Sequence, residues 1–248
     1  MALDHALLRR AAETGEAVLR IYGWSAPTLS LGRHQPTHGI YDARTAQSLG
    51  VDVVRRPTGG RAVLHHREVT YSVTAPIFEE RGRGRRHRVR DVYDGVNQLL
   101  ADALVALGAS VTTARDTPAP LAPTIDSPCF NDAATGELVA EGRKLVGSAQ
   151  WREGRAVLQH GSILIEDDQY LLARLAPSSA PARVATLSDV LGRRPSFVEI
   201  AGVLHAALDD ALARAAGPPA TPLDVESVGP AFLTLRAHYA DPAWTWRL

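Results

Sequence analysis

The sequence predicts an α+β protein with a mainly antiparallel or mixed β-sheet flanked by helices. Apolar residues recur at helical spacing near residues 3–15, 91–108 and 196–217. Short strand-like runs fall into two groups, in residues 17–76 and 137–165. No low-complexity linker separates these elements, so we expect residues 1–248 to form a single domain, long enough to bury a sizeable core.

The elements of the N-terminal half follow from apolar spacing and from turn residues. Leu3, Ala6, Leu7 and Ala11 share one helical face, and that helix should stop at Gly15. The remaining elements are expected as follows: strands at 17–24 and 28–35, a short helix at 40–50, a strand at 51–56, a glycine-rich turn, and a strand at 69–75.

The C-terminal half should contain two long amphipathic helices and a β-meander. The helix at 91–108 would have Asp91 as its N-cap, and the second helix spans 196–217 before an aromatic tail. Residues 137–165 read as three strands joined by tight turns at Gly142-Arg143 and Gly154-Arg155. The three strands and two long helices complete the expected α+β pattern.

Composition excludes several classes of function. Acidic and basic residues both number 27, so no overall field attracts nucleic acid or an anionic membrane. No segment approaches the ~18 apolar residues of a membrane span, and the charged N-terminus lacks the features of a secretory signal. The single cysteine excludes an internal disulfide and suits the cytoplasm.

Lys144 is the only lysine among the 27 basic residues. A lysine offers a compact charge on a flexible stem, so its retention indicates a task that arginine cannot perform, such as holding a carbonyl oxygen or moving a proton. The alternative is a chance survivor on a solvated strand. Strand alternation would place Ser148 and Gln150 on the same face as Lys144, with Gly161 and Gln159 opposite them, which leaves room for a ligand against the sheet.

Cys129 lies in an irregular segment 15 residues before Lys144. It is either a small buried hydrophobe or, if a cation lowers its pKa, a thiolate nucleophile. The run from Arg81 to Arg90 is either a solvated loop or a docking patch for an acidic partner.

The stretch RRPTGGRAVLHH, residues 55–66, could cradle an anion or an acyl chain. Gly59 and Gly60 allow close backbone approach, and the arginines around them could bind phosphate or lie in solvent. His65 or His66 could transfer a proton. The stretch matches neither a Walker loop nor a dinucleotide fingerprint, and the sequence lacks zinc-ligand spacing and the G-x-S-x-G elbow of serine hydrolases.

Taken together, RRPTGGRAVLHHREVTYS and EGRKLVGSAQ…LQHGSIL resemble the lipoate–protein ligase and octanoyltransferase family. That family shares its catalytic fold with biotin–protein ligases. LDHALL, RIYGWSAPTLSLGRHQ and the C-terminal HYADPAWTW extend the resemblance. Arg61 in place of a third glycine and PCFN around Cys129 are more similar to LipM-type octanoyltransferases than to ATP-dependent ligases, whereas His66 in place of the usual Asp departs from both patterns.

The resemblance implies that residues 1–248 form a catalytic domain that acts without a cofactor. Cys129 would take octanoyl from acyl carrier protein and pass it to a lysine of a lipoyl domain, such as the H protein of glycine cleavage. Lys144 would stabilise the thiolate and the oxyanion, and His65 would transfer protons. The implied substrate-binding residues are Arg55, Arg56, Gly59, Gly60, Arg61, Ser148, Gln150, His160 and Gly161.

Three alternatives remain open. An ATP- and magnesium-dependent ligase would use Lys144 to hold an acyl-adenylate, and Cys129 would be incidental. An amidotransferase would move octanoyl between lipoyl domains through the same cysteine. A non-catalytic member of the family would only bind acylated carrier proteins.

Overall fold

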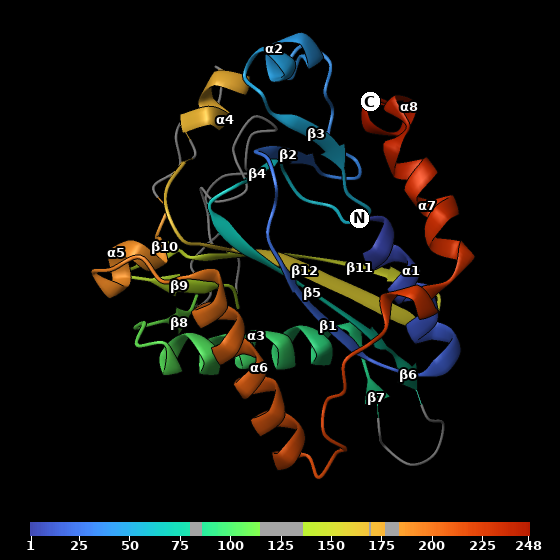
Figure 1. The fold of residues 1–248 in the computed structure, drawn as a ribbon, viewed down its shortest axis with the longest axis vertical. Helices are drawn as coiled ribbons and strands as arrows, with labels where there is room; N and C mark the ends of the chain where they lie inside the picture. Colours follow the sequence, from blue (N-terminus) through green and yellow to red (C-terminus); the bar gives the residue numbers. More distant parts are fainter. Residues whose placement is uncertain (80–85, 115–135, 169, 177–183) are drawn as a thin grey trace.

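The computed structural model describes residues 1–79, 86–114, 136–168, 170–176 and 184–248. Its centre is a four-stranded antiparallel sheet (Figure 1). The strand order is β1 (Val18–Tyr22), β5 (Glu68–Pro76), β12 (Ala156–Leu164) and β11 (Val146–Glu153). Strands that are distant in sequence are therefore neighbours in this sheet.

Smaller sheets surround the central one. In the sheet of β3 (Asp52–Arg55), β2 (Thr28–Leu31) and β4 (Val63–His65), β2 pairs parallel with β3 and antiparallel with β4. The others are a sheet of β10 (Arg143–Lys144), β9 (Leu138–Ala140) and β8 (Thr112–Thr113), and the pair β6 (Phe78–Glu79) and β7 (Arg86–His87). These mixed and antiparallel sheets with flanking helices confirm the predicted α+β class.

Helices cover both faces of the central sheet (Figure 1). Helix α1 (Ala2–Thr14) packs Leu8 against Leu158 of β12 on one face. Helices α3 (Val89–Ala106) and α6 (Phe197–Arg214) enclose the main core on the other face, where Val157 points. Successive residues of a strand point to opposite faces, so side chains of β12 belong to the hydrophobic clusters on both faces of the sheet. The remaining helices are α2 (Ala43–Ser48), α4 (Tyr170–Leu175), α5 (Leu187–Leu191), η1 (Val225–Val228), α7 (Pro230–Ala240) and α8 (Pro242–Thr245).

Most predicted elements are present, although many of their ends differ from the prediction by a few residues. Helix α1 ends at Gly15 in the left-handed conformation, as predicted. The prediction of Asp91 as an N-cap is wrong: Arg88 is the N-cap, and the Asp91 carboxylate accepts a hydrogen bond from the Arg88 N–H at 2.8 Å. Asp91 therefore forms the third position of a capping box.

The prediction of three strands in residues 137–165 is wrong, because the middle strand is divided at Leu145: β10 pairs with β9 in one sheet, and β11 pairs with β12 in the central sheet. The two turns lie at or next to their predicted positions. The second turn lies at Gly154-Arg155, because Glu153 pairs with Ala156. The first lies one residue earlier than predicted, at Glu141-Gly142, where both residues have positive φ, 51° and 72°. Such angles characterise a two-residue hairpin turn of type I′.

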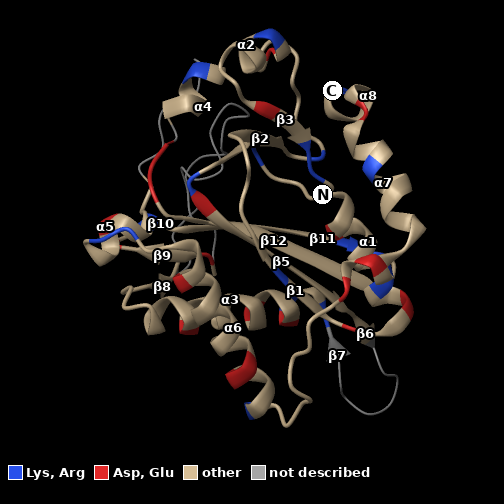
Figure 2. Cartoon of the chain, in the orientation of Figure 1, with Lys and Arg blue, Asp and Glu red and all other residues tan. Residues whose placement is uncertain are grey.

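Basic and acidic residues are distributed over the same elements, for example along α1 (Figure 2). In the part of the chain that the structure describes, every helix is too short or too polar to cross a bilayer.

Candidate active site

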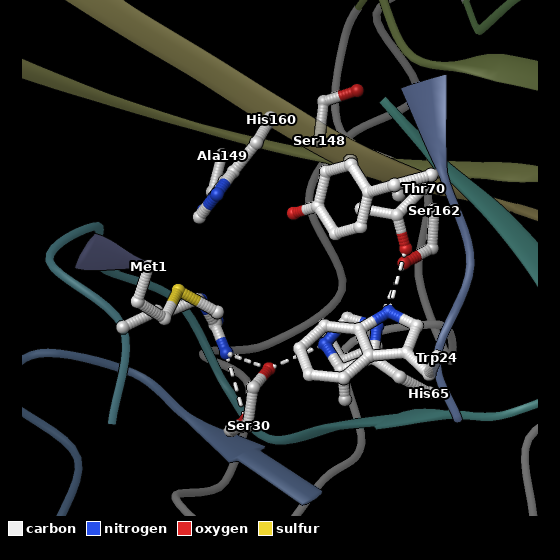
Figure 3. Close-up of a pocket in the computed structure, with 14 residues that line it drawn as sticks. Met1, Trp24, Ser30, His65, Thr70, Ser148, Ala149, His160 and Ser162 are labelled. Atoms are coloured by element: carbon white, nitrogen blue, oxygen red, sulfur yellow. Dashed lines mark hydrogen bonds between the residues drawn. The ribbon is translucent and has the colours of Figure 1, made fainter. Parts of the chain in front are cut away.

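A pocket lies between the central sheet and the β3–β2–β4 sheet (Figure 3). About 390 Å³ within it is free of atoms, part of this volume being open to solvent. It is lined by Met1, Tyr22, Trp24, Ser30, Arg56, Val63, His65, Thr70, Gly147, Ser148, Ala149, His160, Gly161 and Ser162. Five of the predicted site residues are therefore brought together here: Arg56, His65, Ser148, His160 and Gly161.

His65 is held on both ring nitrogens and on one ring face. Its Nδ1 lies 2.7 Å from Glu68 Oε1, and its Nε2 lies 2.7 Å from Ser30 Oγ. The Trp24 ring stacks on it with centroids 4.5 Å apart and planes 18° apart. With Nδ1–H donated to Glu68, Nε2 is placed to accept the proton of the Ser30 hydroxyl.

The structure also distinguishes the two adjacent histidines. His65 is buried in the pocket wall, whereas the His66 side chain is 35% exposed and its Nδ1 lies 2.9 Å from Asp168 Oδ2. The carboxylate that contacts His66 comes from the segment after β12, more than 100 positions away. His65 is thus the one that faces the pocket.

His160 faces the same pocket from β12. Its Nε2 lies 2.7 Å from Thr58 Oγ1, and its Nδ1 lies 4.0 Å from Asp4 Oδ2. Burial lowers the pKa of His160, so the neutral ring is favoured.

Asp4 is fully buried beneath this histidine. It accepts hydrogen bonds from Arg20 and, at 2.7 Å, from Ser72 Oγ. Burial alone would raise the pKa of Asp4, but the N-terminal ammonium, His160 and Arg20 hold it well below its usual range. Asp4 therefore remains a carboxylate in the interior.

Two of the three predicted arginines, Arg55 and Arg56, hold backbone carbonyl groups. Arg55 is fully buried and donates to the carbonyl oxygens of Gly32 (2.6 Å) and Gln35 (2.8 Å), and from Nε to Thr245 (2.9 Å). Burial, with the charges of Arg247 and Arg56, lowers its pKa to about 10. In the described structure Arg55 therefore links the segment after β2 to the C-terminal helix α8.

Arg56 shapes the glycine-rich loop. It donates to the carbonyl oxygens of Ser30 (2.8 Å), Gly59 (2.9 Å) and Arg61 (2.6 Å). Gly60 has a φ of +91°, and a Cβ on Gly59 would meet nothing within 4 Å. Only Gly59 therefore has open space next to its backbone, because a Cβ on Gly60 would lie 2.9 Å from Arg56 Nη2. Gly59, Gly60 and Arg61, predicted to bind substrate, are not part of the pocket lining.

The predicted strand pairing around Ser148 is confirmed, but the space on that face is filled. Ser148 pairs with Gly161, and Gln150 with Gln159. A Cβ on Gly161 would lie 2.7 Å from the Tyr71 ring, whose hydroxyl is 2.7 Å from Ser148 Oγ. Burial raises the pKa of Tyr71 to about 12. Gln150 also lies in this network, through its bond to Gln159, and not in the pocket lining.

Lys144 is buried outside this pocket lining. Its Nζ lies 2.8 Å from Glu137 Oε2, and the two side chains are only 4% and 6% exposed. Cys129, the third predicted catalytic residue, lies in segment 115–135, outside the described residues. Residues 81–85 of the basic run also lie outside them; of the rest, Arg90 is exposed and pairs with Asp94.

Sequence reasoning missed several polar residues that organise the site: Asp4, Trp24, Ser30, Glu68, Thr70 and Glu137. Two signals were available. Asp4 is an acidic residue on the apolar face of a helix, and Glu68 follows His65 by three positions. Among the described residues, no three metal-ligating side chains gather at one point.

The fold and the family of this chain follow from comparison with known proteins. The fold is that of a bi-partite lipoate protein ligase from Thermoplasma acidophilum, with a TM-score of 0.72 over 99% of this chain and 89% of that one, at 19% identity. The family of the lipoyl protein ligase A/B catalytic domain matches residues 1–209. The chain therefore belongs to this family.

The curated relatives are more specific. The octanoyltransferase LipM of Carboxydothermus hydrogenoformans is 38% identical over 83% of this chain and 72% of its own length. That of Symbiobacterium thermophilum is 37% identical over 90% of this chain and 83% of its own length. Others align over 62% to 64% of their length.

Proposed function

We propose that the protein is an octanoyltransferase of lipoate biosynthesis that works through an octanoyl thioester on Cys129. The observation that carries the proposal is the 37% to 42% identity to several octanoyltransferases. The pocket supports it, because its polar side chains bond to other protein groups: Ser30 bonds to His65, and Thr70 donates to Glu68 and accepts from Trp24. The rings of Tyr22 and Trp24 and the Val63 side chain are thus left to contact an apolar acyl chain.

The reaction has two steps. The Cys129 thiolate attacks the carbonyl carbon of the octanoyl thioester, the carbon–sulfur bond to the carrier breaks, and the carrier leaves as a thiol after taking up a proton. A lysine amine of the acceptor then attacks the octanoyl-enzyme, the amide forms, and the amine proton is lost as Cys129 departs as thiolate. The first step exchanges one thioester for another, and the second converts the thioester to a more stable amide. The sequence is therefore downhill, and ATP and other cofactors are not needed.

The chain's residues have separate roles in this proposal. The Lys144 ammonium stabilises the thiolate and the oxyanion of each tetrahedral intermediate. His65, oriented by Glu68, transfers protons. Arg56 binds the carbonyl groups of Ser30 and Gly59 and so fixes the loop of residues 59–61 next to β2. Arg55 binds the Gly32 carbonyl at the end of β2.

The acceptor is a lipoyl domain, as membership of this family implies. We propose the H protein of glycine cleavage as that acceptor and acyl carrier protein as the donor. The single cysteine agrees with a cytoplasmic location, where thiols remain reduced.

Intact-mass analysis tests the proposal. Octanoyl-carrier protein, mixed with the protein without ATP, should add one octanoyl group to the wild type and none to Cys129→Ala. A lipoyl domain added afterwards should remove the group and carry it as an amide. Equal transfer by Cys129→Ala, or use of free octanoate only with ATP and magnesium, would overturn it in favour of the ligase.

A further inference from the structure

The ion pair between Lys144 and Glu137 is buried on both sides. The atoms Nζ and Oε2 are 2.8 Å apart, and less than a tenth of either side chain is exposed. A buried ammonium needs an opposite charge, and a lysine stem that is not held loses much of its positional precision. Glu137 provides both the charge and the fixed contact point.

The backbone around Glu137 is itself anchored. The N–H of Ala114 donates to the Glu137 carbonyl at 2.8 Å, and the N–H of Gly136 donates to the Ala114 carbonyl at 2.9 Å. The side-chain amide of Asn97, on α3, donates to the Gly136 carbonyl at 2.8 Å. The two ends of the segment that carries Cys129 are therefore joined directly beside Glu137.

The same asparagine connects this anchor to the pocket. Asn97 Oδ1 accepts from Gln159 Nε2 at 3.2 Å, and Gln159 also donates to the Tyr71 hydroxyl at 3.1 Å. Tyr71 in turn bonds to Ser148, which belongs to the pocket lining. Hydrogen bonds thus run without interruption from the pocket wall to the residue next to Glu137.

We propose that Glu137 is a positioning residue for Lys144 in octanoyl transfer, and that Asn97 sets the position of Glu137 through the Gly136 carbonyl. The inference rests on the proposed function, because it takes Lys144 as the group that stabilises the thiolate and oxyanion. Glu137 holds the ammonium at one point, and β10 holds the other end of the lysine, since Lys144 pairs with Val139. A rigid cation of this kind is what electrostatic stabilisation of a developing charge requires.

The test compares two glutamates of one hairpin. Glu137→Gln keeps the shape but removes the buried charge, whereas Glu141→Gln removes an exposed charge that pairs with Arg143. In wild type and both variants, the octanoyl transfer rate to a lipoyl domain is measured against acceptor concentration. We expect kcat to fall about 10-fold or more in Glu137→Gln with KM for the acceptor unchanged, since the buried ion pair that fixes the ammonium is replaced by a weaker neutral hydrogen bond. Glu141→Gln should stay within about twofold of wild type.

A double-mutant cycle separates positioning from general damage. If Glu137 acts through Lys144, Glu137→Gln should cause no further loss in a Lys144→Met background. Wild-type kcat in Glu137→Gln, or an equal fold-loss in both backgrounds, overturns the inference. The same cycle with Asn97→Ser should show the same dependence on Lys144, at a smaller loss.

Removing one partner of a buried pair can prevent folding, so Glu137→Asp provides a second variant. The aspartate keeps the negative charge on a side chain that is shorter by one methylene, so the protein should still fold. We expect a several-fold lower kcat at an unchanged thermal midpoint; a wild-type kcat contradicts the inference. If the wild type forms no adduct on Cys129 without ATP, the proposed function fails instead, and the same variants can then be compared in the ATP-dependent reaction.

Discussion

The backbones of Gly32 and Gly60 approach each other so closely that there is no space for a side chain on Gly32. A Cβ built on Gly32 would lie 1.8 Å from the carbonyl oxygen of Gly60. Gly32 follows β2, and Gly60 lies in the glycine-rich loop beside the pocket. The loop can therefore rest on the end of β2 only because residue 32 lacks a side chain.

Gly32→Ala should displace that loop. The obstacle is backbone, which cannot rotate away, so we expect the free energy of unfolding to fall by at least ~2 kcal/mol and octanoyl transfer to fall with it. Urea denaturation measures the first effect. Gly23→Ala is the control, because a Cβ there meets nothing within 4 Å and should change stability by less than about 0.5 kcal/mol. Equal midpoints for the two variants would contradict this account.

Asp4→Asn should destabilise the protein strongly. The carboxylate is fully buried and bonded to Arg20 and Ser72, so its loss leaves a partly buried guanidinium without its partner. We expect a loss of about 3 kcal/mol in the free energy of unfolding. Asp94→Asn, which breaks an exposed pair with Arg90 on α3, should cost less than about 0.5 kcal/mol in the same urea titration. A similar cost for both would mean that Asp4 is effectively solvated.

Mild acid should destabilise the fold through His160. Burial lowers the pKa of His160 in the folded state, while the unfolded chain keeps a value near 6.5. Between these values the unfolded state binds more protons, so this contribution to stability is complete above about pH 6.5 and is lost as pH falls below it.

Thermal unfolding of the wild type and of His160→Gln, measured from pH 7.5 to pH 5.5, tests the effect. The variant should lose less stability over this range than the wild type. His5, whose pKa burial also lowers, remains in both proteins and should leave a residual dependence. Parallel curves for the two proteins would show that folding leaves the pKa of His160 at its unfolded value, contrary to this account.

The sequence was most informative where local periodicity decides the structure. Helix α1, its end at Gly15 and the pairing of Ser148 with Gly161 follow from spacing and turn chemistry, and each is present. The wrong N-cap at Asp91 arose because a capping box has two polar positions, and sequence alone does not say which is first.

The site was harder to predict, because its geometry depends on contacts between distant segments. Strand alternation placed Ser148 correctly but could not reveal that Tyr71 fills the space opposite Gly161. The carboxylates behind His160 and Lys144 come from α1 and from the chain before β9. No spacing rule connects residues 4 and 160.

Ala216→Gly should stabilise the protein. Ala216 follows α6 with a φ of +51°, a conformation that costs a residue with a Cβ roughly 1 kcal/mol and glycine almost nothing. We therefore expect an increase of about 0.5–1 kcal/mol in the free energy of unfolding. Ala215→Gly, at a residue with φ of −83°, is the matched control and should destabilise slightly. Opposite signs for the adjacent substitutions would confirm the backbone origin.

Ala149→Leu should shorten the acyl chain that the pocket accepts. Ala149 pairs with His160 across β11 and β12 and lies beside it in the pocket wall (Figure 3). A larger side chain there takes up space next to the rings that would contact the chain. We expect the ratio of kcat/KM for hexanoyl over octanoyl donors to rise by at least about 10-fold. Arg152→Leu, at an exposed position of the same strand, should leave the ratio unchanged. An unchanged ratio in Ala149→Leu, at a wild-type thermal midpoint, would show that the acyl chain binds elsewhere.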